Sequence, residues 1–220
     1  VVLDIMKIAL CFFGITRSLK FTKKSIQEKI FNVFAKNNIE YDIFLHTYIL
    51  DNYENIRAQE KCNNMDNEEY KLLNPTYFQL DNQDEIKSKI NIENYRTHPD
   101  PWNTNYNSVD NFILAQYSKF QIVKMIQKTN NVYDYVIYLR PDVLYIDDFD
   151  INFFNLVTDK SIAIPNFHLH PKMMFNDRFA ICNKNDYLNY GNIFENLLIL
   201  SRQTFLHSET ILAKYLLSFD

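Results

Sequence analysis

The chain has 220 residues, of which 47% are hydrophobic and 23% charged, and its formal net charge is -4. This composition supports one sizeable core, so a single domain is the default expectation. The acidic balance and the lack of a Lys/Arg stripe argue against nucleic acid as the main partner. Because no apolar run reaches the roughly 18 residues that a membrane-spanning helix needs, we expect no membrane segment.

The cysteines and the ends of the sequence suggest further expectations. The chain has three cysteines, Cys11, Cys62 and Cys182. An odd number without CxxC spacing indicates neither a disulfide framework nor a zinc site. A reducing, cytoplasmic compartment is the simplest explanation. Met6 resembles a natural start, so we expect the domain to span residues 6–220, with residues 1–5 as an upstream remnant. No obvious end signal precedes residue 220, which is compatible with the N-terminal domain of a longer protein.

The first predicted unit is a strand followed by a helix. The apolar run at residues 7–13 predicts a buried strand, and Gly14 closes it. Ser25 and Glu28 have capping-box spacing for the first turn of the next helix. Apolar residues recur at helical spacing along that helix and form one apolar face, through Ile26, Ile30, Val33 and Phe34. A single glycine does not make a dinucleotide fingerprint. Either Arg17 and backbone amides of the loop hold a nucleotide, or Arg17 is a plain surface residue.

The next segment returns to a strand and then leaves the core. Residues 41–48 predict a strand that pairs in parallel with the first, and His46 near its end is expected to be a hydrogen-bonded packing residue. Residues 51–74 are polar and predict a surface excursion with partial helix. A short strand at 76–80 and a short helix at 84–92 follow. In the loop at 95–107, Trp102 either packs into the core or stacks on a sugar.

The clearest helix covers residues 108–128, with Ser108 as its expected N-cap. Gln116 interrupts its apolar face. A buried amide must find hydrogen-bond partners. Gln116 therefore either braces the edge of the sheet or contacts a ligand.

The central element is predicted at residues 132–150. Residues 136–139 are β-branched, aromatic or aliphatic and indicate a strand buried on both faces. Pro141 ends regular pairing, so that Arg140 and Asp142 project at the carboxyl end of the strand. Ligands bind at that end in open α/β sheets. Arg140 and Asp142 either pair only with each other or belong to a binding site.

The remaining chain predicts strands at 161–165 and before Cys182, and helices at 186–200 and after Ser208. Two imidazoles, His168 and His170, share a face of extended chain and suggest a weak metal site. Asp177 precedes a strand. Glu209 lies in the first turn of the last helix, where the helix dipole favours it. The order of elements predicts an α/β sandwich with a mostly parallel sheet.

Five segments, taken together and in this order, resemble a known family. The chain is similar to the small GT-A-type glycosyltransferases of large DNA viruses and bacterial surface-polysaccharide clusters, over residues 6 to 217. The segments are FGITR at 13–17, YDIFLHT at 41–47, YLRPD at 138–142, NDRFA at 176–180 and HSET at 207–210. The resemblance implies a GT-A-like, Rossmann-like α/β/α sandwich. It also implies transfer of a hexose or deoxyhexose from a nucleoside-diphosphate sugar, most often a UDP-sugar, to a glycan acceptor, in the host cytoplasm if the protein is viral.

The resemblance also implies roles for the donor-binding residues. The family's DxD motif holds a divalent ion, Mn or Mg, on the diphosphate, and Asp142 would be its retained metal-side carboxylate. Arg140 occupies the position of the first aspartate. One carboxylate binds such ions poorly, so Arg140 is an alternative bidentate partner for the diphosphate. Gly14, Thr16 and Arg17 would hold the nucleotide, and Gln116 is a further candidate contact.

For the chemistry, the resemblance implies a carboxylate that takes the proton of the acceptor hydroxyl. Glu209 corresponds to the acidic motif that supplies this base in inverting members, and Asp177 is its rival. Two other classes stay open. A catalytically silent nucleotide-sugar or carbohydrate-binding module is favoured by the altered DxD. A sulfotransferase is disfavoured, because no phosphate-cradling loop rich in Ser, Thr and Gly lies near the start.

Overall fold

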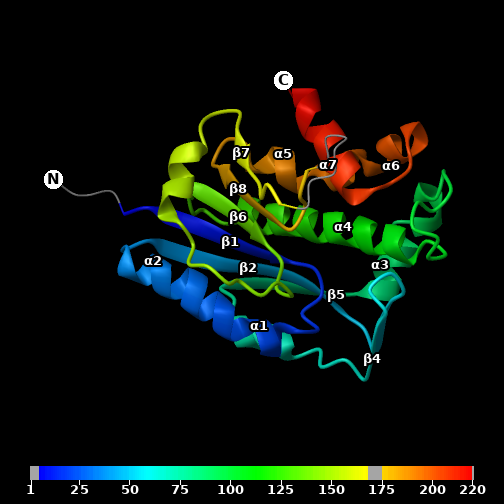
Figure 1. Cartoon of the computed structure of the whole chain (residues 1–220), viewed down its shortest axis with the longest axis horizontal. Coiled ribbons are helices and arrows are strands. Elements are labelled where there is room, and N and C mark those ends of the chain that lie inside the picture. The colour runs from blue at the N-terminus through cyan, green and yellow to red at the C-terminus, as the bar shows by residue number, and fades with distance from the viewer. Residues whose placement is uncertain (1–4, 168–174, 220) are drawn as a thin grey trace.

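The computed structural model of the protein describes residues 5–167 and 175–219, and it is an α/β fold built on a six-stranded sheet (Figure 1). The strand order is β5-β2-β1-β6-β8-β7. Four strands, β5, β2, β1 and β6, are parallel, while β8 runs antiparallel to both β6 and β7. The predicted mostly parallel sheet is therefore confirmed. The strands are β1 (Lys7–Phe13), β2 (Glu40–Ile49), β5 (Tyr77–Asn82), β6 (Tyr135–Leu139), β7 (Ile162–Ala163) and β8 (Phe179–Asn183).

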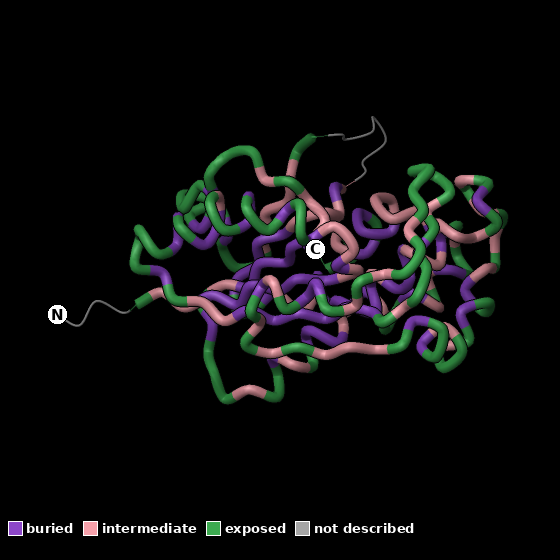
Figure 2. The backbone as a smooth tube through the Cα atoms, turned by 90° about the horizontal axis from the view of Figure 1, so that it is seen from below, coloured by how far each residue is buried: buried purple, intermediate pink, exposed green. Residues whose placement is uncertain are grey.

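Helices cover both faces of this sheet, which explains why its central strands are uniformly apolar. Along β1, Ala9, Cys11 and Phe13 pack into the core beneath α4, whereas Ile8, Leu10 and Phe12 pack into the core beneath α1, as the two layers of Figure 1 show. Figure 2 shows the buried segments of the backbone concentrated in the interior of the molecule. One layer comprises α1 (Leu19–Ile26) and α2 (Asn32–Lys36). The other comprises α4 (Asn107–Lys128), α5 (Tyr187–Gly191), α6 (Ile193–Gln203) and α7 (Ser208–Leu216).

The first helix begins earlier than its predicted cap. It starts at Leu19 and continues through a π-helical turn (Gln27–Phe31) into α2, and its predicted apolar face is buried. The capping box at Ser25 is therefore wrong, because Ser25 lies inside the helix. The Ser25 hydroxyl donates to the carbonyl of Thr22 (2.8 Å) and accepts from the amide of Tyr145 (3.1 Å). Ser25 thus ties this helix to the segment that follows β6.

The surface excursion contains a hairpin that the sequence pattern did not predict. It pairs β3 (Asn52–Asn55) with β4 (Glu60–Asn63), and a 3-10 helix (Glu69–Leu73) follows. The hairpin strands are short and mostly exposed, so they lack the apolar alternation by which strands are predicted. Tyr53 is the buried anchor of the hairpin.

Several predicted helix boundaries are corrected. The cap of α4 is Tyr106, in left-handed conformation with φ 64°, so Ser108 lies inside the helix. The cap of α7 is His207, which makes Ser208 its first residue. The predicted helix at 186–200 is two helices, separated at Asn192. The remaining helical segments are α3 (Gln83–Lys89) and the 3-10 turns Ile92–Tyr95, Ile151–Leu156 and Leu217–Phe219. His168 and His170 lie outside the described residues.

The chain has 2 glycines, and each occupies a position that another residue would fit poorly. Gly14 ends β1 with φ +95°, which is strained for residues with a Cβ. At Gly191, an added Cβ would lie 2.3 Å from both the Tyr138 hydroxyl oxygen and a methyl carbon of Val123. Gly191 therefore allows α5 to approach the sheet. Within the described ranges, no helix combines the length and the apolar character needed to cross a membrane.

Candidate functional site

A pocket of about 190 Å³ opens at the carboxyl edge of the parallel strands. Its walls come from the segments that follow β1 and β6, from the first turns of α4 and from the β3–β4 hairpin. Gly14 and Arg17 line it from the β1 side, and Arg140 and Asp142 line it from the β6 side. This is the edge at which open α/β sheets bind ligands.

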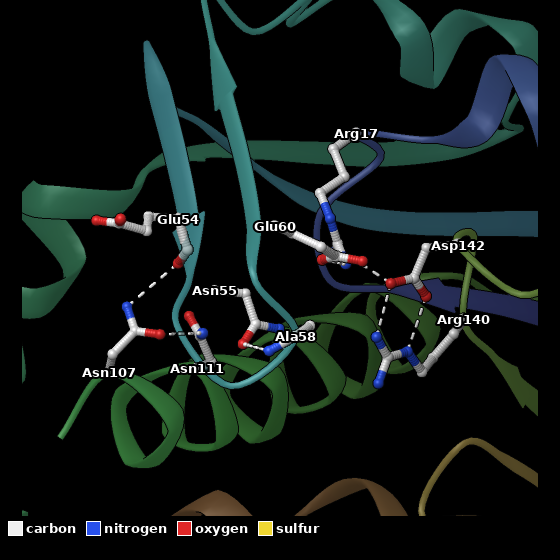
Figure 3. A network of polar contacts seen from close by, with 9 residues as sticks. All are labelled: Arg17, Glu54, Asn55, Ala58, Glu60, Asn107, Asn111, Arg140 and Asp142. Carbon is white, nitrogen blue, oxygen red and sulfur yellow. Dashed lines mark hydrogen bonds and ion pairs between the residues drawn. The ribbon is translucent and has the colours of Figure 1, made fainter. Parts of the chain in front are cut away.

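Two arginines converge on one aspartate in this pocket (Figure 3). Asp142 accepts two hydrogen bonds from Arg140, of 2.8 Å from Nε and 2.6 Å from Nη2, and a third of 3.0 Å from Nη1 of Arg17. The other terminal nitrogen of Arg17 donates to Glu60 on the hairpin at 2.8 Å. The Arg17 guanidinium also lies 4.4 Å from the ring centroid of Tyr53. Arg140 and Asp142 therefore both pair with each other and line the pocket, so the two alternatives left by the sequence are not exclusive.

These contacts keep the cluster ionised. Burial alone would raise the pKa of Asp142, whose side chain is 8% exposed, but Arg140 and Arg17 hold that pKa below its usual value. Burial disfavours the charged form of Arg140, yet Asp142 raises the pKa of the guanidinium above its usual value. The cluster consequently places two arginines around one carboxylate, and Arg57 and Asp177 are further charged residues of the pocket lining.

This donor set does not fit a divalent metal ion. Mg and Mn favour several oxygen ligands, whereas both oxygens of Asp142 accept hydrogen bonds from guanidinium groups. No cluster of three or more His, Cys, Asp or Glu side chains suited to a metal occurs in the parts of the chain that the structure describes. The Asp142 carboxylate is thus arranged to pair with arginine side chains.

The other predicted donor contacts lie at different depths. Gly14 lines the pocket, and its amide donates to the hydroxyl of Ser118 at 3.0 Å. Thr16 is 5% exposed and does not line the pocket; its carbonyl accepts from the amide of Leu19. Gln116 lines the pocket and is 2% exposed, and its side-chain oxygen has no hydrogen-bond partner among the described residues. An unpaired buried carbonyl is costly, so Gln116 offers an acceptor to a donor group in the pocket.

The two candidate bases are placed differently. Asp177 lines the pocket together with Arg140. Glu209 is not among the lining residues, although its neighbour Ser208 is, and the Glu209 carboxylate lies 3.5 Å from Nδ1 of His207. The structure therefore brings Arg140, Asp142 and Asp177 together around one opening, with Glu209 beside it.

An aromatic pair borders the pocket on the side of α7. Trp102 lines the pocket and stacks on His207, with ring centroids 5.0 Å apart. Arg57, from the turn of the hairpin, lies 5.4 Å from the Trp102 ring centroid. Asp100 organises this loop by accepting hydrogen bonds from the amides of Trp102 and Tyr106. Trp102 is thus half-buried: it packs against the margin of the core and also forms a wall of the pocket.

Sequence reasoning missed a buried lysine beneath this pocket. Lys119 is 0% exposed, and its amine has no hydrogen-bond partner in residues 5–167 and 175–219. The amine lies 4.1 Å from the ring centroid of Tyr190 and 5.3 Å from that of Phe13. Burial lowers the pKa of Lys119 to about 7, although the nearby charge of Asp177 acts in the opposite direction. Its position three residues after Gln116, on the inward face of the helix, was the available signal.

A second buried network supports the Gly14 loop. His46 is fully buried, as its prediction as a packing residue requires, with Nδ1 2.9 Å from the Ser118 hydroxyl oxygen and Nε2 3.1 Å from a carboxylate oxygen of Asp81. Ser118 in turn accepts from the Gly14 amide. Although this is a Ser-His-Asp arrangement, Ser118 is 0% exposed and cannot reach a substrate. The network instead connects β5 to the pocket loop.

Comparison with known proteins does not assign the chain to a family. No family model matches the chain, and no curated protein matches it.

Proposed function

We propose that the protein is a GT-A-like glycosyltransferase that transfers a sugar from a nucleoside-diphosphate sugar, in the first place a UDP-sugar, to a glycan acceptor. The observation that carries this proposal is the pair Arg17 and Arg140, two guanidinium groups facing one pocket at the carboxyl edge of a parallel sheet. Arginine binds phosphate oxygens through two parallel hydrogen bonds. The pair would therefore take the diphosphate, with the Gly14 loop beside it.

In this proposal the guanidinium groups supply the positive charge that a divalent ion supplies in the resembled family. The acceptor hydroxyl oxygen attacks the anomeric carbon as the bond from that carbon to the diphosphate oxygen breaks. The electron pair leaves on the diphosphate, which Arg17 and Arg140 stabilise. The hydroxyl proton passes to a carboxylate, for which Asp177 is better placed than Glu209 because it lines the pocket.

The acceptor side would be the border formed by Trp102 and His207. A sugar presents flat C–H faces that pack on an aromatic ring, and Trp102 and Ser208 both line the pocket. The pocket volume of about 190 Å³ is below the roughly 300–1,000 Å³ usual for ligand sites. Donor binding is therefore expected to displace the hairpin that Glu60 ties to Arg17.

The test is sugar transfer or donor hydrolysis with a panel of UDP-sugars, comparing wild type with Asp177→Asn and Glu209→Gln. The proposal expects Asp177→Asn to lower turnover by about 100-fold or more, a typical contribution of general-base catalysis. Glu209→Gln should change turnover only slightly. A large loss confined to Glu209→Gln would transfer the role to Glu209.

The second candidate is a catalytically silent nucleotide-sugar-binding module. The saturation of Asp142 by two arginines favours it, because the carboxylate typical of the family's metal site is occupied. Calorimetric binding of UDP-sugars by wild type, without hydrolysis or transfer for any acceptor tested, would select this function.

A further inference from the structure

Lys119 is a buried amine that faces the rings of Tyr190 and Phe13, at 4.1 Å and 5.3 Å from their centroids, instead of a hydrogen-bond acceptor. It lies on α4, one turn beyond Gln116, with a fully buried side chain and no hydrogen-bond partner among the described residues. An unpaired buried ammonium is costly, so such groups lose their proton unless a nearby negative charge retains it. A methionine would fill the same space without this cost.

Among the described residues, the groups that act on the amine include one source of negative charge. Tyr190 of α5 and Cys182 of β8 stay protonated at neutral pH, because burial raises the pKa of each well above its usual value. Phe13 contributes only its ring. Asp177, which precedes β8, is the carboxylate that acts on Lys119, and it also acts on Arg140. Lys119 is thus coupled through Asp177 to the cationic wall of the pocket.

Two residues connect the amine to the pocket. Phe13 and Asp177 both line the pocket, and both lie against Lys119 or act on its charge. A negative charge added to the pocket therefore acts on the amine through these buried neighbours. As an order of magnitude, a unit negative charge about 8 Å from an ammonium raises the pKa of that ammonium by roughly 1.5 units when the effective dielectric constant is about 20.

We propose that Lys119 takes up a proton when a phosphate-bearing ligand enters the pocket, and so becomes a third cationic group of the anion site behind Arg17 and Arg140. This inference rests on the anion site of the proposed function but not on sugar transfer. At pH 8, above its pKa of about 7, the amine is mostly neutral in the empty protein, and the third cation forms when an anion binds.

The test is titration calorimetry with UDP and, separately, with inorganic pyrophosphate at pH 8, in buffers of different ionisation enthalpy. The slope of observed enthalpy against buffer ionisation enthalpy gives the number of protons taken up. With the pKa of Lys119 near 7 in the free protein, an upward shift of about 1.5 units corresponds to about two-thirds of a proton at pH 8.

The key variant is Lys119→Met, which keeps the volume of the side chain and removes the titrating amine. At pH 8 it should bind UDP about fourfold more weakly, which is the proton-linked gain for a pKa that rises from about 7 to about 8.5, with proton uptake near zero. Lys124→Met is the matched control, because Lys124 is exposed on the same helix, and it should keep wild-type uptake and affinity. Thermal melting of Lys119→Met, expected to be at or above that of wild type, shows that the variant folds.

The outcomes separate the two proposals. If wild type binds UDP or pyrophosphate without proton uptake, or if Lys119→Met takes up protons as wild type does, the role of Lys119 is refuted while the anion site stands. If neither ligand binds wild type, the anion site itself fails, and both proposals fail with it.

Discussion

Arg17 and Asp142 are 125 positions apart in the sequence, yet a terminal nitrogen of the guanidinium lies 3.0 Å from a carboxylate oxygen. The contact joins the loop after β1 to the loop after β6, the two central parallel strands. Since Asp142 also binds Arg140, ion pairs connect the ends of these strands at the mouth of the pocket. The two arginines of this cluster are the residues proposed to take the diphosphate.

Glu60 competes with an anionic ligand for Arg17. Its carboxylate accepts from Arg17 at 2.8 Å and is 47% exposed. Glu60→Gln should therefore tighten UDP binding, by up to about fivefold, the scale of an exposed ion pair. Calorimetric titration measures the change. Glu54→Gln, on the same hairpin, should leave affinity unchanged, because only its backbone carbonyl holds Asn107 (Figure 3). Weaker binding by Glu60→Gln would show that the contact shapes the site rather than competing for it.

The Asp142 cluster should make the free energy of unfolding depend on pH in the acid range. The pKa of Asp142 in the folded protein is below its usual value, so its contribution is complete above the unfolded value of about 3.9. That contribution is lost as pH falls through the folded pKa. The free energy of unfolding of wild type should fall as pH decreases from about 5 to about 3.

Asp142→Asn should be less stable than wild type at pH 7, by about 2 kcal/mol, with a flatter profile in the acid range. Denaturant unfolding at a series of pH values measures both effects. Asp147→Asn is a control on the same loop, since Asp147 is exposed, and should follow the wild-type profile. An Asp142→Asn profile parallel to that of wild type would contradict this role.

The two glycines should respond differently to alanine. Gly191→Ala places a methyl group against the Tyr138 hydroxyl and Val123, and it should cost about 3 kcal/mol, the upper range for overpacking. Gly14→Ala has open space for its Cβ and should cost only about 1–2 kcal/mol of backbone strain. Thermal or denaturant unfolding distinguishes them. UDP affinity should fall for Gly14→Ala and stay unchanged for folded Gly191→Ala.

Trp102 should affect the acceptor more than the donor. Trp102→Ala removes the ring that stacks on His207 and lies near Arg57. We expect KM for the acceptor to rise about 10-fold or more, the scale of a buried aromatic contact, while UDP affinity changes less than threefold. Trp102→Phe keeps an aromatic face and should restore most of the acceptor affinity. Equal losses for donor and acceptor would place Trp102 in the nucleotide site.

Patterns of burial were readable from the sequence, whereas contacts between distant polar residues were not. The strands at 7–13 and 136–139 and the long helix α4 were predicted because each has a simple apolar signature. The β3–β4 hairpin has none, since its strands are held by Tyr53 and by contacts with Arg17 and α4. The caps at Ser25 and Ser108 failed because spacing alone does not show where a helix begins.

In the candidate site too, the positions of residues on a strand could be predicted, whereas contacts between distant residues could not. Arg140 and Asp142 were predicted at the end of a central strand, where backbone geometry dictates their place. The partnership of Asp142 with Arg17 depends on which strands pair, and the sequence does not state that order. The burial of Lys119 was not predicted, because it depends on α5 and α6 covering α4 in addition to the sheet.

The most direct measurement is calorimetric titration of UDP into wild type and Arg17→Met/Arg140→Met, in the presence of EDTA. The proposed site predicts that wild type binds without a divalent ion and that the double variant, checked for folding by circular dichroism, binds at least about 100-fold more weakly, the scale of two charge-assisted contacts. Equal affinities for the two proteins, or wild-type binding only when Mn replaces EDTA, would contradict a diphosphate site built on these arginines.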